Sequence, residues 1–107
     1  MKDIFWLGSS YDDLLEFPKE ARKEVGFNLH RVQIGLEPYD CKSMPSIGSG
    51  VKEIRIHSQN EYRVVYVAKY KEAIYVLHSF VKKTQQTRKS DIDLAKERLK
   101  EIEHRGK

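Results

Sequence analysis

Apolar residues recur along this chain with two different periods, and the change of period separates the expected helices from the expected strands. Between residues 17 and 36 they recur at steps of three or four, which is typical of one buried stripe on a helix. Pro18 fits the first turn of this helix, because its missing N–H would have no intrahelical partner there. Gly35 fits the end, because glycine adopts the left-handed conformation easily. The pattern predicts a helix of about 17 residues.

Three strand-like runs follow this helix. They cover residues 51–57, 62–68 and 73–80, they are rich in valine, isoleucine and tyrosine, and four residues separate each run from the next. Connections this short force neighbouring strands to run antiparallel, so we expect a meander. Residues 37–50, which precede the runs, contain two prolines, two glycines and three serines and are expected to form a loop.

Shorter elements are expected near the two ends of the chain. Residues 3–8, "DIFWLG", are apolar and aromatic and end at a glycine, which predicts a strand. A serine followed three residues later by an aspartate resembles a capping box, and it predicts helix starts at Ser10 and Ser90. We expect the first of these helices to end at about Glu16 and the second to run for about 13 residues.

These elements predict the order βααβββα. A chain of 107 residues is long enough for one hydrophobic core, and it contains no internal repeat and no linker. We therefore expect a single domain over residues 1–107, of the α+β class, with the helices packed on one side of an antiparallel sheet.

Composition adds constraints on the partner and the compartment. The chain is 39% hydrophobic and 34% charged, with a formal net charge of +4 and a pI of about 9.2. A basic protein of this kind is compatible with a polyanion partner. The single cysteine, Cys41, has no partner for an internal disulfide, and no apolar run is long enough to span a bilayer. The first residues lack the apolar core of a secretory signal, so we expect a cytoplasmic protein that does not contact a membrane.

Several kinds of site are absent from the sequence. The segment "IGSG" lacks the lysine and the serine or threonine of a phosphate-binding loop. The four histidines are not spaced as zinc ligands, and Cys41 stands beside Lys42 in an expected loop, which disfavours a Cys–His nucleophile. We expect no metal and no cofactor.

Positive charge is concentrated at one end of the predicted sheet. Counting residues about the second hairpin places Arg63 opposite His78, so the basic residues that follow this strand should lie beside Arg63. Counting across the first hairpin as a plain four-residue loop puts Arg55 and Arg63 on opposite faces, and a site shared by both then needs an odd loop or a bulge. The cations of this end are Lys52, Arg55, Arg63, Lys82, Lys83, Arg88 and Lys89.

Most of these candidates also have a structural interpretation. The cations after the last strand can be a solvated strand exit. A buried Arg63 is costly unless it faces an anion or forms a salt bridge with Glu53 or Glu61. His78 is expected to be a hydrogen-bonded core histidine. The strand tyrosines are expected to pack in the core, although one near the hairpin can stack on a base: Tyr62, Tyr66 and Tyr75.

Three motifs in this region carry a family resemblance. The segments "EIR", "YRVVY" and "LHSFVKKT", in this order and spacing, resemble the RelE/HigB superfamily of bacterial type II toxins. The chain is most similar to the HigB-like branch described as phage-derived Gp49-like proteins. The resemblance extends over roughly residues 3–103, and it implies the RelE-like fold with the element order βααβββα.

The resemblance also implies an activity and its residues. Such toxins are metal-independent endoribonucleases that cut mRNA in the ribosomal A site, and a cognate antitoxin, here expected to be a helix-turn-helix protein, holds them inactive. Arg55 matches a basic site residue, Arg63 matches the arginine thought to bind the scissile phosphate, and Lys83 matches a cation that supports the transition state. The residues expected to extend the RNA-binding surface are Lys52, Tyr62, Lys82, Arg88 and Lys89.

The sequence departs from the family pattern in two places. Glu53 stands where some relatives have a lysine, so it weakens the positive field or acts as a base itself. The C-terminal region has no tyrosine for proton transfer, and His57 at the hairpin edge is the preferred substitute over His78. Two other functions stay open: inhibition of DNA gyrase, against which the basic cluster argues, and non-catalytic binding of RNA or an acidic peptide.

Overall fold

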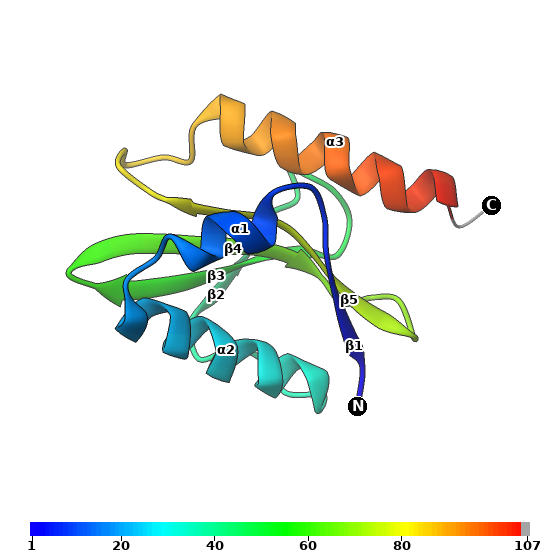
Figure 1. Ribbon diagram of the computed structural model, residues 1–107. Helices are drawn as coiled ribbons and strands as arrows, with labels where there is room; N and C mark the ends of the chain where they lie inside the picture. The colour runs from blue at the N-terminus through cyan, green and yellow to red at the C-terminus, as the bar shows by residue number, and fades with distance from the viewer. Residues whose placement is uncertain (106–107) are drawn as a thin grey trace.

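The computed structural model describes residues 1–105 (Figure 1). The elements follow the order βααββββα, with one strand more than expected. This strand lies in the segment 37–50, which was predicted to be a loop. It is three residues long and mostly exposed, so it carries no alternating apolar pattern that the sequence could reveal. The elements are β1 (Asp3–Trp6), α1 (Ser10–Leu15), α2 (Lys19–Gln33), β2 (Cys41–Ser43), β3 (Val51–Ser58), β4 (Asn60–Val67), β5 (Ala73–Val81) and α3 (Lys89–Arg105).

The five strands form one sheet in the order β1-β5-β4-β3-β2. The antiparallel meander of β3, β4 and β5 is confirmed, and the α+β class with it. At one edge, β1 pairs with β5 in parallel, with Phe5 beside Tyr75, so the sheet is mixed rather than wholly antiparallel. At the other edge, β2 pairs antiparallel with β3.

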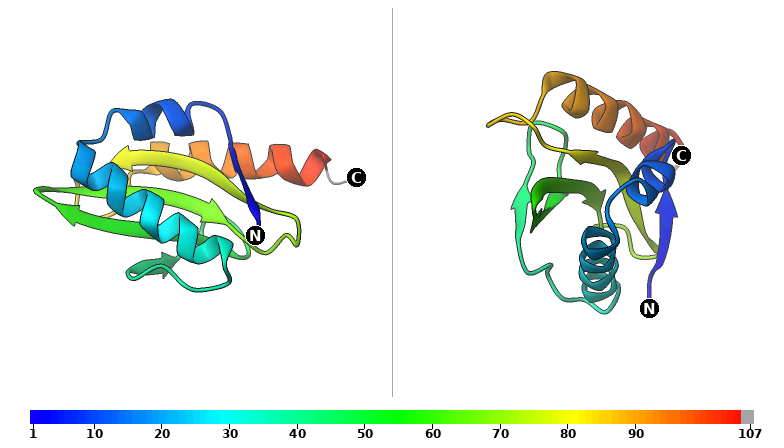
Figure 2. Two further views of the ribbon diagram at one scale, coloured as in Figure 1. Left: turned by 60° about the horizontal axis from the view of Figure 1, so that its bottom comes forward. Right: turned by 60° about the vertical axis from the view of Figure 1, so that its left-hand side comes forward.

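Helices cover both faces of the sheet, and the prediction that they pack on one side is wrong. Figure 2 shows α2 and α3 on opposite faces. The reason lies in β4, where six consecutive residues are buried, so both of its faces need an apolar cover. The α2 face is packed by residues that include Ala21, Val25, Leu29, Ile54, Val64 and Tyr66, and the α3 face by residues that include Val65, Val67, Leu77, Ala95, Leu99 and Ile102.

The register of the first hairpin brings the two strand arginines together. Arg55 pairs directly with Arg63, and side chains paired in this way lie on the same face. The plain four-residue loop is replaced by a tight turn at Gln59, whose φ is 65°. Because Ser58 pairs with Asn60, the loop has an odd number of residues, as a site shared by both arginines requires.

The second hairpin differs from simple counting by two residues. Arg63 pairs with Phe80, and His78 pairs with Val65. A bulge in β5 beside Val65 and Tyr66 accounts for one residue of this difference. The turn between β4 and β5 accounts for the second residue. Because the total shift is even, Arg63 and His78 still belong to the same face.

The helix bounds are close to those expected. Helix α2 ends before Gly35, which has a φ of 89°, as the sequence predicts. Helix α3 runs for 17 residues, longer than the 13 or so expected, because it begins one residue earlier and continues to Arg105. None of the helices within residues 1–105 is long and apolar enough to cross a membrane.

Candidate functional site

Arg55 and Arg63 face each other across the first hairpin, but each guanidinium binds carboxylates. Arg55 Nη2 lies 2.8 Å from Asp40 Oδ1, and Arg55 Nε donates to the same oxygen at 2.9 Å. The backbone N–H of Arg55 also donates to the carbonyl of Asp40, at 2.9 Å. The residue that precedes β2 therefore fixes Arg55 through both its backbone and its side chain.

Arg63 is buried, with only 4% of its surface exposed. Its Nη2 lies 3.0 Å from Glu61 Oε1, its Nε lies 3.5 Å from Glu53 Oε1, and Nη1 donates to the carbonyl of Tyr62 at 3.0 Å. Of the two interpretations open for Arg63, the structure has the salt bridge, and it uses both acids. An RNA phosphate can reach this guanidinium only if these bonds break.

Glu53 is even more deeply placed, with 1% of its surface exposed. Burial raises the pKa of this carboxyl, while the charges of Arg63, Lys82 and Lys42 act to lower it. The hydroxyl of Thr87 lies 3.5 Å from Glu53 Oε2, so the segment after β5 folds over this acid. Glu53 therefore balances the charge of Arg63 and does not contact solvent as a base would need to.

His57 lies between two carboxylates. Its Nε2 is 2.7 Å from Asp40 Oδ2, and its Nδ1 is 2.7 Å from Glu61 Oε1. These hydrogen bonds, first to Asp40 and then to Glu61, raise the pKa of the imidazole, and the bond to His57 lowers the pKa of each acid. A histidine held in this way favours the protonated form, and with both ring nitrogens bonded to carboxylates it has no free nitrogen to act as a base.

Together these residues form a continuous series of alternating charges, which we call the charge ladder. Among the cations of the ladder, the most exposed are His57 and Arg55, with 53% and 37% of their side chains exposed. The ladder consists of Arg55, Asp40, His57, Glu61, Arg63 and Glu53.

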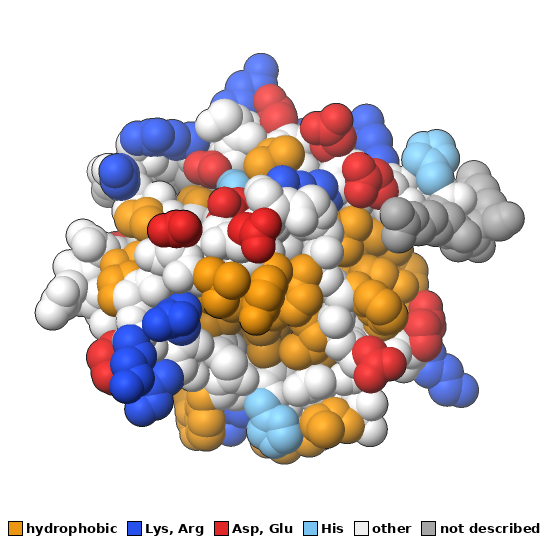
Figure 3. Space-filling view, viewed as in Figure 1, with side chains coloured by type: hydrophobic (Ala, Val, Ile, Leu, Met, Phe, Trp, Pro, Cys, Tyr) orange, Lys and Arg blue, Asp and Glu red, His pale blue; other side chains and the backbone are white. Residues whose placement is uncertain are grey.

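The cations after β5 are placed differently. The N–H of Lys82 donates to the carbonyl of Glu61 at 2.7 Å, so the segment begins beside the ladder. Within residues 1–105, the side chains of Lys83, Arg88 and Lys89 are exposed and make no ion pair. We call residues 82–89, which end on the first residue of α3, the cationic loop. In Figure 3, Lys and Arg side chains gather where this loop leads into α3.

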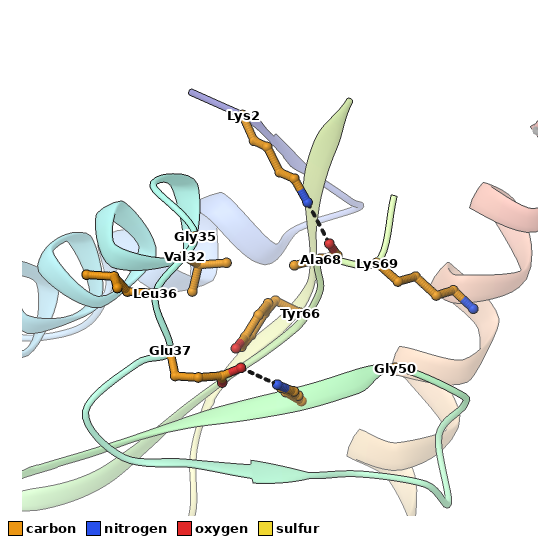
Figure 4. A pocket seen from close by; sticks show the side chains of 10 residues that line it. Lys2, Val32, Gly35, Leu36, Glu37, Gly50, Tyr66, Ala68 and Lys69 are labelled. Atoms are coloured by element: carbon orange, nitrogen blue, oxygen red, sulfur yellow. Dashed lines mark hydrogen bonds and ion pairs between the residues drawn. The ribbon is translucent and has the colours of Figure 1, made fainter. Parts of the chain in front are cut away.

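Three other predicted residues lie outside this cluster. Lys52 Nζ lies 2.7 Å from Glu37 Oε1, beside a cavity of about 310 Å³ on the α2 face (Figure 4). Tyr62 is buried and its ring centroid lies 4.7 Å from that of Phe17, so packing, rather than RNA contact, accounts for this side chain. The remaining residue, His78, is also buried, and its Nε2 bonds to Asp91 at 2.7 Å as expected of a core histidine.

Sequence reasoning missed Asp40, the residue that joins Arg55 to His57. It lies in the segment that was predicted to be a loop, 15 residues before Arg55, and its role depends on the pairing of β2 with β3. Only a prediction of that short strand would have placed it. In the part of the chain that the structure describes, no three potential ligands are grouped closely enough to hold a metal ion.

Comparison with known proteins gives one family. No curated protein matches the chain. Residues 12–100, most of the sequence, match the family described as "Phage derived protein Gp49-like (DUF891)". The chain therefore belongs to the phage-derived Gp49-like family, which is a RelE/HigB-like toxin family.

Proposed function

We propose that this protein is the toxin of a type II toxin–antitoxin pair and that it cleaves mRNA in the ribosomal A site without a metal. Membership of the Gp49-like family supports the toxin assignment and implies an antitoxin partner. One observation carries the nuclease proposal: Lys82 N–H bonds the carbonyl of Glu61, and the carboxylate of Glu61 binds His57. The cationic loop therefore begins next to the acid that holds a histidine favouring its protonated form.

The chemistry divides between these two regions. When a ribose 2′-hydroxyl attacks the adjacent phosphate, water takes the hydroxyl proton and negative charge builds on a phosphorane, which fixed cations stabilise. Lys83 supplies this charge, and Arg55 is the partly exposed guanidinium that the ladder contributes. Protonated His57 is the general acid for the departing 5′-oxygen, and one of its N–H groups must first release Asp40 or Glu61. Arg63 acts as a positioning residue, because it holds Glu61 where Glu61 can bind His57.

RNA binding then falls mainly to the cationic loop. Its four basic residues can follow a phosphate backbone, and this interaction is electrostatic and independent of sequence. An antitoxin, which we expect to be a helix-turn-helix protein, would inhibit the toxin by laying acidic residues over the same loop. The proposed site of action is the cytoplasm, where the ribosomes are.

The decisive experiment compares one lysine of the loop with a lysine elsewhere. Lys83→Ala should lower the rate of mRNA cleavage on ribosomes by about 100-fold, since it removes one charge from the transition state. Lys71→Ala, which removes an exposed lysine at the turn between β4 and β5, should cleave like the wild type. Growth arrest without the antitoxin should follow the same pattern. Intact transcripts after induction of the wild type would contradict the nuclease proposal.

A second function is favoured by the ion pairs of the ladder. Because Arg55 and Arg63 are already neutralised, the protein can bind RNA through the cationic loop without cleaving it. In that case the wild type should bind RNA in a strongly salt-dependent way while transcripts remain intact, and Lys83→Ala should weaken binding only slightly.

A further inference from the structure

A groove of about 590 Å³ runs beside the charge ladder, between α2 and the segment that precedes β2. One end is lined by the aromatic rings of Phe27 and Tyr39. The other end is lined by Asp40, Arg55 and His57, which are members of the ladder. The groove therefore continues the candidate site and is not separate from it.

The aromatic end is unusually exposed. Tyr39 is 70% exposed and Phe27 54%, and the two rings are nearly parallel, with an interplanar angle of 8° and centroids 5.6 Å apart. The guanidinium carbon of Arg31 lies 4.1 Å from the centroid of the Tyr39 ring. Tyr39 as a whole residue stays 70% exposed beside these neighbours, so a further planar group can reach it from solvent.

The protein holds this exposed ring in place. The backbone N–H of Tyr39 donates to the side-chain oxygen of Asn28 at 2.8 Å, and Asn28 is buried and bonded to the carbonyl of Glu24. Arg31 Nε donates to the carbonyl of Glu37 at 2.8 Å. Both anchors come from α2, so the segment is fixed before any ligand arrives. A preorganised aromatic surface loses less entropy on binding than a mobile one.

We propose that this groove binds one unpaired base of single-stranded RNA, stacked on Tyr39, next to the phosphate that is cleaved. The inference rests on the proposed function and names the part of the substrate that the site recognises. Every base has a flat π face, so stacking on an aromatic ring is a general way to bind single strands.

The charges around the groove set the direction of the strand. Glu20 and Glu24 outnumber Lys23 on the α2 wall, which is therefore net negative and disfavours phosphates. Arg55 and His57 line the opposite wall, so the backbone must follow that side. Asp40 follows Tyr39 directly and binds both cations, so the phosphate of a base on Tyr39 lies near Arg55 and His57 and competes with the Asp40 carboxylate for them. This complementarity favours a nucleotide over an acidic peptide, which would meet Glu20 and Glu24.

The test replaces Tyr39 with a small and with a larger flat side chain. Tyr39→Ala should weaken binding of a short single-stranded RNA by about 5- to 150-fold, and Tyr39→Trp should retain it. A 2-aminopurine base in that RNA should be quenched by the wild type and by Tyr39→Trp but not by Tyr39→Ala. Tyr11→Ala removes another exposed aromatic, on α1, and serves as the matched control with wild-type binding. The melting temperature of Tyr39→Ala should be unchanged.

The outcomes separate this inference from the proposed function. If the wild type cleaves mRNA and Tyr39→Ala binds and cleaves equally well, the base subsite is wrong and the nuclease stands. If Tyr39→Ala loses only its affinity for the antitoxin, the groove is a protein interface and the inference is overturned. If the wild type neither binds nor cleaves RNA, the proposed function fails and the subsite fails with it.

Discussion

The cations of the sheet and the cations of the loop after β5 lie at the same end of the molecule but have opposite environments. In the charge ladder, three basic groups (Arg55, protonated His57 and Arg63) alternate with three carboxylates, so the ladder is close to neutral. The cationic loop has four basic residues and no acid between 82 and 89. Net positive charge at this end therefore comes from the loop.

The difference separates structural charge from charge that a ligand can use. A buried ion pair gains little net stability, but removing one partner is costly because the other stays buried and unpaired. An exposed lysine contributes little to folding, and its charge is free to attract a polyanion. The ladder should therefore respond to mutation mainly in stability, and the loop mainly in binding.

The largest expected effect comes from breaking the ladder at its buried end. Arg63→Ala leaves the carboxylate of Glu53 buried without its main cation and should lower the free energy of unfolding by about 3–5 kcal/mol. The measurement is chemical denaturation followed by circular dichroism. Loss of activity in this variant would not by itself identify Arg63 as a catalytic residue.

A double variant separates the two explanations. Arg63→Met with Glu53→Leu replaces the buried pair by apolar side chains of similar size, and it should recover most of the lost stability. Glu61, which is partly exposed, can then be hydrated by water. If Arg63→Ala is as stable as the wild type, the buried ion pair is not structural and the comparison between the two regions fails.

A smaller effect is expected when the loop loses its charge. The triple variant Lys83→Ala, Arg88→Ala, Lys89→Ala should unfold like the wild type, because these side chains are exposed. Its affinity for single-stranded RNA should depend less on salt, with a slope smaller by about 2. Between 50 and 200 mM salt, the wild type should therefore lose about 20-fold more affinity than the variant.

The control for this experiment has the same change in net charge. Lys71→Ala, Lys96→Ala, Lys100→Ala removes three exposed lysines outside the loop, at the turn before β5 and on α3. It should keep the wild-type salt dependence if position matters, and an equal loss in both triples would show that only net charge matters.

Periodic patterns predicted the elements well, because burial of one face leaves a repeating signal. The stripe from Ala21 to Val32 on α2 and the runs that became β3, β4 and β5 are examples. The two-sided cover of the sheet was predicted wrongly, although the uninterrupted run "VVYV" of β4 is the pattern that indicates it. The exposed three-residue strand β2 had no such pattern.

The site was harder to predict because pairing, rather than composition, decides which charges meet. The turn at Gln59 places Arg55 opposite Arg63, and a bulge in β5 together with the turn before it places Phe80, not His78, beside Arg63. Asp40 reaches Arg55 only through the register of β2. A sequence records the candidate acids and bases, while one-residue differences in turns and bulges select the partners.

The smallest effect expected is a pH dependence that belongs to the ladder alone. The pKa of His57 is raised above its ordinary value of 6.5, so its contribution to stability is complete below that pH and is lost as the pH rises through the raised value. Asp40 and Glu61 have lowered pKa values, so their contributions are lost only as the medium becomes acidic, below 3.8 and 4.5 respectively.

Titration of His57 by NMR and thermal unfolding at a series of pH values measure this effect. Asp40→Asn should move the pKa of His57 back towards its ordinary value, because it removes the larger cause of the shift. His57→Ala should flatten the fall in melting temperature above neutral pH, whereas His30→Ala, at an exposed position on α2, should leave it in place. The loop triple variant keeps His57 and both of its acids, so it should keep the wild-type profile. A profile that changes in that variant, or one unaffected by His57→Ala, would mean that the two regions are not independent.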